Sequence, residues 1–221
     1  MRPITKDNLD LTLYLVTDRT GITAEQLLDK VDKACQGGVT LVQLREKECT
    51  TLEYISLARA LRKVTAKYNV PLLIDDRVDV ALAANAEGVH LGTEDMPIRA
   101  AREILGENAI IGATAKTIER ARSAEAEGAD YLGTGAIFEP TVKVKTRRTT
   151  IPQLNAICQS VRIPVAAISG INRGNLDQLA DSPIAGIALI AAIMDADDPE
   201  EEARLLKRDI QEKILSRGPR P

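Results

Sequence analysis

Residues 70–91 have the sequence VPLLIDDRVDVALAANAEGVHL, which has the pattern of a strand, a helix and a second strand. The apolar runs Pro71 to Asp75 and Gly88 to Leu91 predict two buried strands, and the stretch between them predicts a connecting helix. Strands joined in this way run parallel and are covered by their helices. This unit decides the fold class, because the same order of elements recurs along the chain.

The alternation of a short apolar run with an amphipathic stretch occurs about eight times. Apolar residues repeat at helical spacing from Leu27 to Cys35 and from Leu57 to Val64, and the third and seventh strands open alike, at residues 70–74 and 163–168. One helix is expected after each strand. The remaining strands are predicted at Leu13 to Thr17, Thr40 to Leu44, Ala109 to Gly112, Asp130 to Thr134, Pro164 to Ile168 and Ile184 to Ile190.

Four strands are entered through a glycine, which we expect to end the preceding helix in the left-handed conformation. These glycines are Gly38, Gly88, Gly128 and Gly186. Eight such units in 221 residues favour an α/β fold, a single-domain (β/α)8 TIM barrel over residues 1–221. A doubly wound dinucleotide fold is disfavoured, because no G-x-G-x-x-G follows the first strand. We expect residues 1–11 to form an N-terminal extension, the stretch after Pro199 to form the last helix, and residues 217–221 to be a frayed tail.

Composition excludes several classes of protein. The chain is 44% hydrophobic and 28% charged, which is typical of a soluble globular protein rather than a disordered one. Its net charge of −3, with no Trp and one Phe, argues against binding to nucleic acid or to an anionic membrane. The three cysteines have no C-x-x-C spacing, so neither a disulfide framework nor a zinc site is indicated.

Two features of the sequence bear on where in the cell the protein is expected. Residues 1–11 carry charges and no continuous apolar stretch, so we expect neither a signal peptide nor an anchor. The longest apolar run, Ile184 to Met194, is too short to span a bilayer. We therefore expect a cytoplasmic protein.

In barrels of this kind, the active site lies at the carboxyl ends of the strands and in the loops that follow. Alternate strand residues point the same way, so Gln43, Arg45 and Lys47 should converge on the barrel mouth. For Lys47 the alternative is a surface ion pair with Glu46. A Gln inside an apolar strand needs polar partners, which favours a functional role for Gln43.

Two carboxylates follow neighbouring strands. Asp76 and Asp95 suit a Mg²⁺ ion that takes its remaining ligands from water and a substrate phosphate, so they suggest a diphosphate substrate. The alternatives are that Asp76 pairs with Arg77 and that Asp95 caps the helix that begins at Met96-Pro97.

Cationic groups and a loop predict two phosphate subsites. Arg45, Lys47, Lys116 and Lys143 could neutralise a departing diphosphate, while the Gly170 loop and the helix N-terminus after strand eight stand where barrels commonly bind a monophosphate. His90, inside strand four, is expected to be a buried structural residue rather than a general base. The candidate residues do not suit acyl transfer or zinc hydrolysis.

The sequence resembles that of the thiamine-phosphate synthase family over nearly the whole chain. The similarity rests on motifs at successive strand ends, namely Leu13-Tyr14-Leu15-Val16-Thr17-Asp18, Gln43-Leu44-Arg45-Glu46-Lys47, Asp76-Arg77-Val78-Asp79, Gly88-Val89-His90-Leu91-Gly92 with Asp95, Gly128-Ala129-Asp130-Tyr131 and Ser169-Gly170-Ile171. The resemblance implies a transferase that moves hydroxymethylpyrimidine from its diphosphate to the ring nitrogen of thiazole phosphate and releases diphosphate. It also implies a dissociative, Mg²⁺-assisted mechanism, which needs charge neutralisation and positioning more than a strong base.

The same resemblance implies residue roles. It assigns the diphosphate to Gln43, Arg45 and Lys47, the Mg²⁺ ion to Asp76 and Asp95, and the leaving group to Lys143, so that Arg45, Lys47 and Lys143 would be catalytic. Further substrate-binding positions are Asp75, Thr114 beside the pyrimidine, Thr141, and Gly170, Ile190 and Ala191 around the thiazole phosphate. The family allows a homo-oligomer, either dimer or trimer.

The sequence departs from the family pattern in several places. Asp75 replaces an Asn, Thr93 a Gln and Thr114 a Ser, and Ala191 stands where the family has Ser. Compared with the family pattern, residues 139–143 lack one side-chain hydroxyl and carry another at a different position. Thiazole phosphate should therefore be held mainly by backbone groups. The alternatives are a thiazole tautomerase or another phosphate-binding barrel isomerase, although Ala136 or Ile137 stands where a tautomerase has His, and a non-catalytic sensor.

Overall fold

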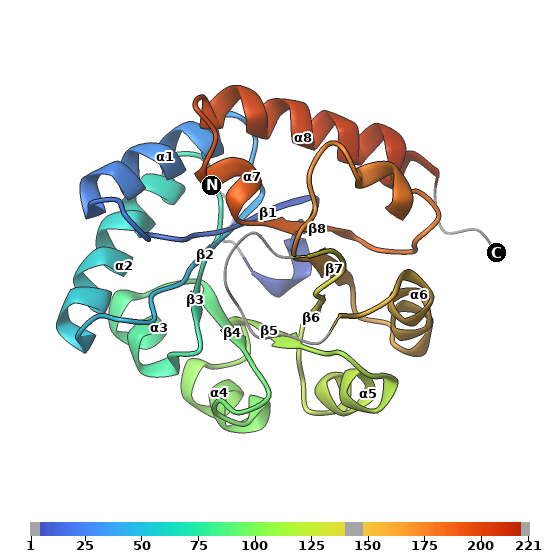
Figure 1. Ribbon diagram of the computed structural model, residues 1–221. Coiled ribbons are helices and arrows are strands. Elements are labelled where there is room, and N and C mark those ends of the chain that lie inside the picture. The colour runs from blue at the N-terminus through green and yellow to red at the C-terminus, as the bar shows by residue number, and fades with distance from the viewer. Residues whose placement is uncertain (1–4, 140–147, 218–221) are drawn as a thin grey trace.

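Eight parallel strands form a closed barrel in chain order, with β1 hydrogen-bonded to β8 (Figure 1). The computed structural model describes residues 5–139 and 148–217. The strands are β1 (Leu13–Val16), β2 (Leu41–Leu44), β3 (Leu72–Asp75), β4 (Gly88–Leu91), β5 (Ile110–Thr114), β6 (Tyr131–Thr134), β7 (Val165–Ile168) and β8 (Gly186–Leu189). The prediction of a (β/α)8 barrel is confirmed.

Helices surround the barrel (Figure 1). They are α1 (Ala24–Gln36), α2 (Thr51–Ala66), α3 (Val78–Ala84), α4 (Ile98–Leu105), α5 (Ile118–Ala126), α6 (Ile151–Ser160), α7 (Ala191–Met194) and α8 (Pro199–Lys213), with 3₁₀ turns η1 (Lys6–Asn8), η2 (Leu176–Leu179) and η3 (Leu215–Arg217). Three helices begin with a threonine capping box, formed by Thr23 in α1, Thr50 in α2 and Thr150 in α6, which satisfies backbone N–H groups of the first turn. Within the described residues, no helix is both long and apolar enough to cross a membrane.

The expectation of one helix after each strand is wrong at β7, which is followed by the short 3₁₀ turn η2. Side chains of the linking segment bind nearby backbone groups there, since the Asn172 Oδ1 accepts from the Gly174 N–H and the Asn175 Oδ1 accepts from the Asn172 N–H. Such local bonds compete with the bonds of an α-helix.

The core has two layers. In β1, Leu13 and Leu15 pack against the helices, whereas Tyr14 and Val16 point into the barrel. The barrel interior is a packed cluster rather than a pore, and consists of Leu11, Tyr14, Val16, Leu41, Leu73, Ile110, Tyr131, Ala166 and Ala188. Because two of these residues are tyrosines, the interior needs hydrogen-bond partners for their hydroxyls.

Some predicted strand ends are wrong. β5 extends to Thr114 rather than ending at Gly112, because Thr114 pairs with Gly133 of β6. β8 is shorter than the predicted Ile184 to Ile190, because pairing with β1 and β7, rather than the length of the apolar run, sets its ends.

The glycine prediction holds at two positions. Gly38 and Gly128 have φ of +109° and +99° and precede their strands, as expected. Gly88 and Gly186 are instead the first residues of β4 and β8, and neither is in the left-handed conformation. A Cβ at either would overlap a backbone carbonyl of the adjacent segment, so glycine is needed there for close backbone approach.

Candidate active site

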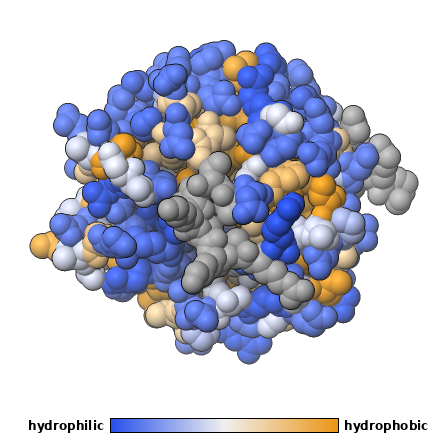
Figure 2. All heavy atoms as spheres, in the orientation of Figure 1, coloured by the Kyte–Doolittle hydropathy of each residue, from blue (hydrophilic) through white to orange (hydrophobic). Residues whose placement is uncertain are grey.

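A cavity of about 670 Å³ opens at the carboxyl ends of the strands, with residues from all eight strands or their following segments in its wall. Figure 2 shows the molecule in the same orientation as Figure 1, with mainly hydrophilic residues at its periphery. The cavity is the default position for an active site in this fold. The wall includes the expected residues Gln43, Arg45, Lys47, Asp75, Asp76, Thr114, Gly170, Ile190 and Ala191.

Gln43 in β2 and Arg45 and Lys47 just beyond its end all line this cavity, as the alternation of side chains predicts. Gln43 lies deepest, only 4% exposed, and its Nε2 donates a 2.6 Å hydrogen bond to the Tyr14 hydroxyl. The Lys47 Nζ lies 2.7 Å from the Asp75 Oδ2 and also contacts the Asp76 carboxylate. Lys47 is therefore held over the mouth between two carboxylates.

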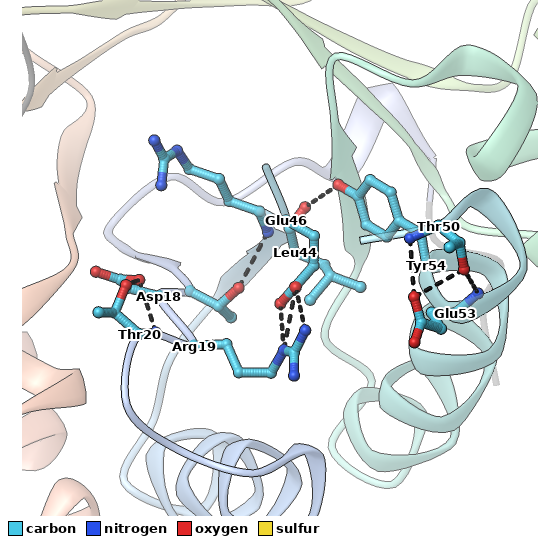
Figure 3. Close-up of polar contacts among 10 residues, drawn as sticks. Asp18, Arg19, Thr20, Leu44, Glu46, Thr50, Glu53 and Tyr54 are labelled. Atoms are coloured by element: carbon cyan, nitrogen blue, oxygen red, sulfur yellow. Dashed lines mark hydrogen bonds and ion pairs between the residues drawn. The ribbon is translucent and has the colours of Figure 1, made fainter. Parts of the chain in front are cut away.

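The predicted alternative of a Glu46–Lys47 surface pair is wrong. Glu46 points away from the cavity and accepts from the Arg19 guanidinium at 2.8–3.0 Å (Figure 3). The Thr17 hydroxyl accepts from the Arg45 N–H at 3.0 Å. These contacts tie the end of β2 to the end of β1, which fixes the backbone that carries Arg45 and Lys47.

Asp18 and Tyr54 support the same segments from outside the cavity wall (Figure 3). The Asp18 Oδ1 accepts from both the N–H and the hydroxyl of Thr20, and the Tyr54 hydroxyl donates to the carbonyl oxygens of Leu44 and Asp75. Asp18 thus stabilises a turn, and Tyr54 bridges the ends of β2 and β3.

Asp76 and Asp95 follow the ends of β3 and β4, close enough for Asp76 to affect the pKa of Asp95. Asp76 lines the cavity, with a left-handed φ of +61°, and Asp95 stands just outside the wall, where its Oδ2 accepts a 2.6 Å hydrogen bond from Gly92 N–H. Burial and the adjoining Asp76 raise the pKa of Asp95.

Both structural alternatives for this acidic pair are wrong. Arg77 pairs with Asp79 rather than with Asp76, at 2.6 Å. The N-cap residue of α4 is Pro97, and no side chain caps that helix. The two carboxylates are therefore left to face each other at the mouth.

Charge in this part of the site is concentrated and partly buried. Burial and the nearby Asp76 raise the pKa of Asp75 to about 6, against the opposing effect of Lys47. For Lys47, burial would lower the pKa, but its contacts with Asp75 and Asp76 outweigh burial and raise it. An ammonium group held between carboxylates shows that this corner of the cavity favours cations.

The donor set fits a magnesium ion that is incompletely ligated by protein. Among the described residues, no group of three or more His, Cys, Asp or Glu side chains is arranged to hold a metal. Two adjacent carboxylates are what Mg²⁺ commonly takes from a protein when water and substrate phosphate complete its octahedron. Asp76 and Asp95 are the residues that could hold it.

The floor of the cavity is a hydrogen-bonded series that the sequence did not predict. The hydroxyls of Tyr14 and Tyr131 lie 2.8 Å apart, and the His90 Nδ1 lies 2.9 Å from the Tyr131 hydroxyl. The His90 Nε2 lies 3.0 Å from the Thr114 Oγ1. His90 is buried, as expected, and burial lowers its pKa to about 4, so it is neutral at physiological pH.

Another part of the cavity wall comes from the segments that follow β7 and β8. Ser169 and Gly170 follow β7 with φ of +85° and +67°, and a Cβ at Gly170 would lie 2.5 Å from the Glu139 carbonyl oxygen. Ile190 and Ala191 follow β8, where α7 begins inside the ring of outer helices (Figure 1). Gly170, Ile190 and Ala191, the residues predicted for a monophosphate subsite, all line the cavity.

Some predicted residues are not placed and some lining residues were missed. Thr141 and Lys143 lie outside the described residues. Lys116 lines the cavity, as expected of a cation there. Tyr14 and Asn172 also line it, although the sequence singled out neither side chain. The apolar run that contains Tyr14 predicts a strand, but it does not show which face of that strand points into the barrel.

The fold and the cavity together define a TIM-barrel enzyme whose cavity is lined by cationic and acidic side chains and by the segments that follow β7 and β8. Comparison with known proteins gives the family. Residues 13–193 match the family model described as thiamine monophosphate synthase. The chain belongs to this family and is a transferase.

Individual relatives agree with this assignment. "Thiamine-phosphate synthase 2" of Streptococcus pneumoniae serotype 4 is 50% identical over 206 residues, which cover 93% of this chain and 98% of the relative. "Thiamine-phosphate synthase" of Clostridium tetani is 48% identical over 86% of this chain and 91% of its own. The solved structure of thiamine phosphate pyrophosphorylase from Pyrococcus furiosus is 41% identical, with a TM-score of 0.81, and covers 90% of this chain and 96% of that one.

Proposed function

We propose that this chain is a thiamine-phosphate synthase that joins hydroxymethylpyrimidine, supplied as its diphosphate, to the ring nitrogen of thiazole phosphate and releases diphosphate. The observation that carries the proposal is one cavity lined by Arg45, Lys47 and Asp76, with Asp95 beside it, and by Gly170 and Ala191. The named relatives support the same assignment.

The diphosphate belongs at the β2 and β3 ends. Arg45 and Lys47 offer donors to its oxygens, and Lys143 would add a third cation as the leaving group departs. Asp76 and Asp95 would hold Mg²⁺, which when bound neutralises charge on the diphosphate. An incoming diphosphate competes with Asp75 and Asp76 for Lys47, so the ammonium is already positioned where negative charge will lie.

The reaction is dissociative in this proposal. The bond between the pyrimidine methylene carbon and the diphosphate oxygen breaks with both electrons leaving on oxygen, and the thiazole nitrogen then donates its lone pair to the methylene cation. No proton has to be removed in either step. The neutral, buried His90 agrees with this, since the site needs no general base.

The thiazole phosphate belongs at the Gly170 and Ala191 end. Backbone N–H groups in a glycine loop and at the first turn of a helix are common phosphate donors. Ala191 carries no hydroxyl, so the backbone must supply most of the binding there. A tautomerase would need a proton-transfer group after β6. Among the residues of this segment that the structure describes, Gly135 and Ala136 form the cavity wall, so no observation favours that reading.

The test is to incubate the purified chain with hydroxymethylpyrimidine diphosphate, thiazole phosphate and Mg²⁺ and to measure thiamine phosphate, with each component omitted in turn. Lys47→Gln should lower kcat. Lys63→Gln, which removes an exposed lysine of α2, should not. Binding of both substrates without product would contradict the proposal and indicate a sensor, and isomerisation of a thiazole precursor would indicate a tautomerase.

A further inference from the structure

The hydrogen bonds on the cavity floor connect β2 to β5 through the barrel interior. They run from Gln43 through Tyr14, Tyr131 and His90 to Thr114, at 2.6, 2.8, 2.9 and 3.0 Å. We refer to this series as the Gln43–Thr114 chain. Gln43, Tyr14, His90 and Thr114 also line the cavity, so the chain connects the diphosphate side of the site to the side assigned to the pyrimidine.

Either tyrosine hydroxyl could donate to the other, and the roles of the His90 nitrogens depend on its tautomer, but one donor pattern gives every member of the chain a partner. In this pattern the Gln43 amide nitrogen, which can only donate, bonds to the Tyr14 oxygen, and the Tyr14 proton goes to the Tyr131 oxygen. Tyr131 has then accepted, and its proton goes to His90 Nδ1. A neutral imidazole that accepts at Nδ1 carries its proton on Nε2, so His90 donates to the Thr114 oxygen.

The Thr114 hydroxyl therefore accepts from His90, and its own proton is left to point elsewhere. Because Thr114 lines the cavity, that proton is available to a ligand. The side chains are buried away from water, which could otherwise reverse individual bonds; Tyr14, Tyr131 and His90 are 2%, 0% and 9% exposed. Both phenols remain protonated, because burial raises the pKa of Tyr14 and of Tyr131.

We propose that Tyr131 and His90 are positioning residues that hold the Thr114 hydroxyl as a hydrogen-bond donor toward a ring nitrogen of the pyrimidine substrate. The inference rests on the proposed function for the identity of the ligand. It assigns Tyr131, which does not line the cavity, an effect on substrate binding through two intervening side chains. It also makes the site selective for a heterocycle with an acceptor atom at that position.

The chain's single histidine makes the donor pattern directly measurable. In untagged protein labelled with ¹⁵N-histidine, the ring nitrogen shifts of His90 report which nitrogen carries the proton. We expect the proton on Nε2. A spectrum with the proton on Nδ1 would overturn the proposal, and this measurement needs no variant and no turnover.

Tyr131→Phe removes one hydroxyl and keeps the ring that packs against Tyr14 and His90. Without a donor at Nδ1, the preference of His90 for the Nε2–H form should weaken, and the Kd for pyrimidine diphosphate, measured by calorimetry, should rise about three- to tenfold. The KM for thiazole phosphate should stay unchanged. Tyr68→Phe is the control, since it removes the hydroxyl of a tyrosine that follows α2 and neither lines the cavity nor belongs to the Gln43–Thr114 chain.

The control should leave both the His90 spectrum and the pyrimidine affinity unchanged. If Tyr131→Phe altered neither, or raised both substrate constants equally, Tyr131 would have only a structural role. The two proposals fail separately. If the wild-type protein has no turnover but carries the His90 proton on Nε2, the proposed function is contradicted. If turnover is normal but the His90 proton lies on Nδ1, only this inference is contradicted.

Discussion

Asp75 and His90 occupy paired positions on the neighbouring strands β3 and β4. Burial shifts the pKa of each side chain in the direction that favours its neutral form. The pKa of Asp75 rises to about 6 and that of His90 falls to about 4. The two shifts have opposite effects on stability. The folded state binds a proton more readily than the unfolded state at Asp75 and less readily at His90, so the two contributions change in opposite directions between pH 4 and pH 6.

The first prediction concerns the pH dependence of stability through His90. Its folded pKa lies below its ordinary value of 6.5, so the stability due to neutral His90 is present above pH 6.5 and lost as the pH falls toward 4. Relative to His90→Gln, the wild-type chain should lose about 3 kcal/mol of unfolding free energy across that window. Urea unfolding of both proteins at several pH values measures the difference, in which the Asp75 contribution cancels. Parallel curves would contradict the prediction.

The second prediction concerns metal dependence. Asp95→Asn should lower kcat at least about 100-fold, because one of two carboxylate ligands is lost. Its stability should change by less than about 1 kcal/mol, since the amide oxygen can still accept from Gly92 and the repulsion from Asp76 is removed. Protein treated with EDTA should be inactive until Mg²⁺ is restored.

Asp18→Asn is the control for the acidic pair, because Asp18 stabilises a turn at Thr20 and does not line the cavity. It should have a much smaller kinetic effect than Asp95→Asn. Undiminished turnover in EDTA would show that the carboxylates have another role.

The third prediction concerns the thiazole phosphate end. Ala191→Ser adds a hydroxyl beside the proposed phosphate subsite, and one neutral hydrogen bond contributes about 0.5–1.5 kcal/mol. The KM for thiazole phosphate should therefore fall by up to about tenfold, while that for pyrimidine diphosphate stays nearly constant. Ala196→Ser, beyond the end of α7 and outside this cavity wall, should change neither constant. Equal effects on both substrates would show that the subsite is assigned to the wrong strands.

The fourth prediction concerns Gly112 of β5. A Cβ at this position would overlap the Tyr131 ring and hydroxyl. Gly112→Ala should cost about 1–3 kcal/mol of unfolding free energy through overpacking. It should also displace Tyr131, so the His90 ring signals should shift together with the loss of stability. Calorimetric unfolding and the histidine spectrum measure the two effects, and a stable variant with an unchanged spectrum would contradict this account.

The side-chain directions along β2 could be predicted because they depend only on the two-residue period of a strand. Gln43, Arg45 and Lys47 therefore appear where expected, although the partners of the lysine do not. Glu46, between Arg45 and Lys47, must face the other way, and its partner Arg19 comes from the preceding strand-to-helix segment. Adjacency in sequence made Glu46 and Lys47 look like partners, whereas strand geometry separates them.

Contacts between distant strands could not be predicted. Tyr14 and Tyr131 are separated by 117 positions, and their contact depends on barrel closure and on the register of each strand. His90 illustrates the same limit, since its burial followed from its apolar neighbours, but its partners come from β5 and β6. Local pattern thus specified which residues are buried, and only the assembled barrel specified what they touch.

The pairing of β1 with β8 has a consequence for how the chain is made. β1 leaves the ribosome before the other strands of the barrel, yet one of its two hydrogen-bonded neighbours is β8, the last barrel strand in chain order. Until then, the growing sheet has open edges that can pair with other chains, and α1 lacks the neighbouring α8. Nascent or truncated chains without β8 should therefore be the species that aggregate and that chaperones bind. Protection from aggregation should develop in one late step, when β8 pairs with β1 and closes the barrel.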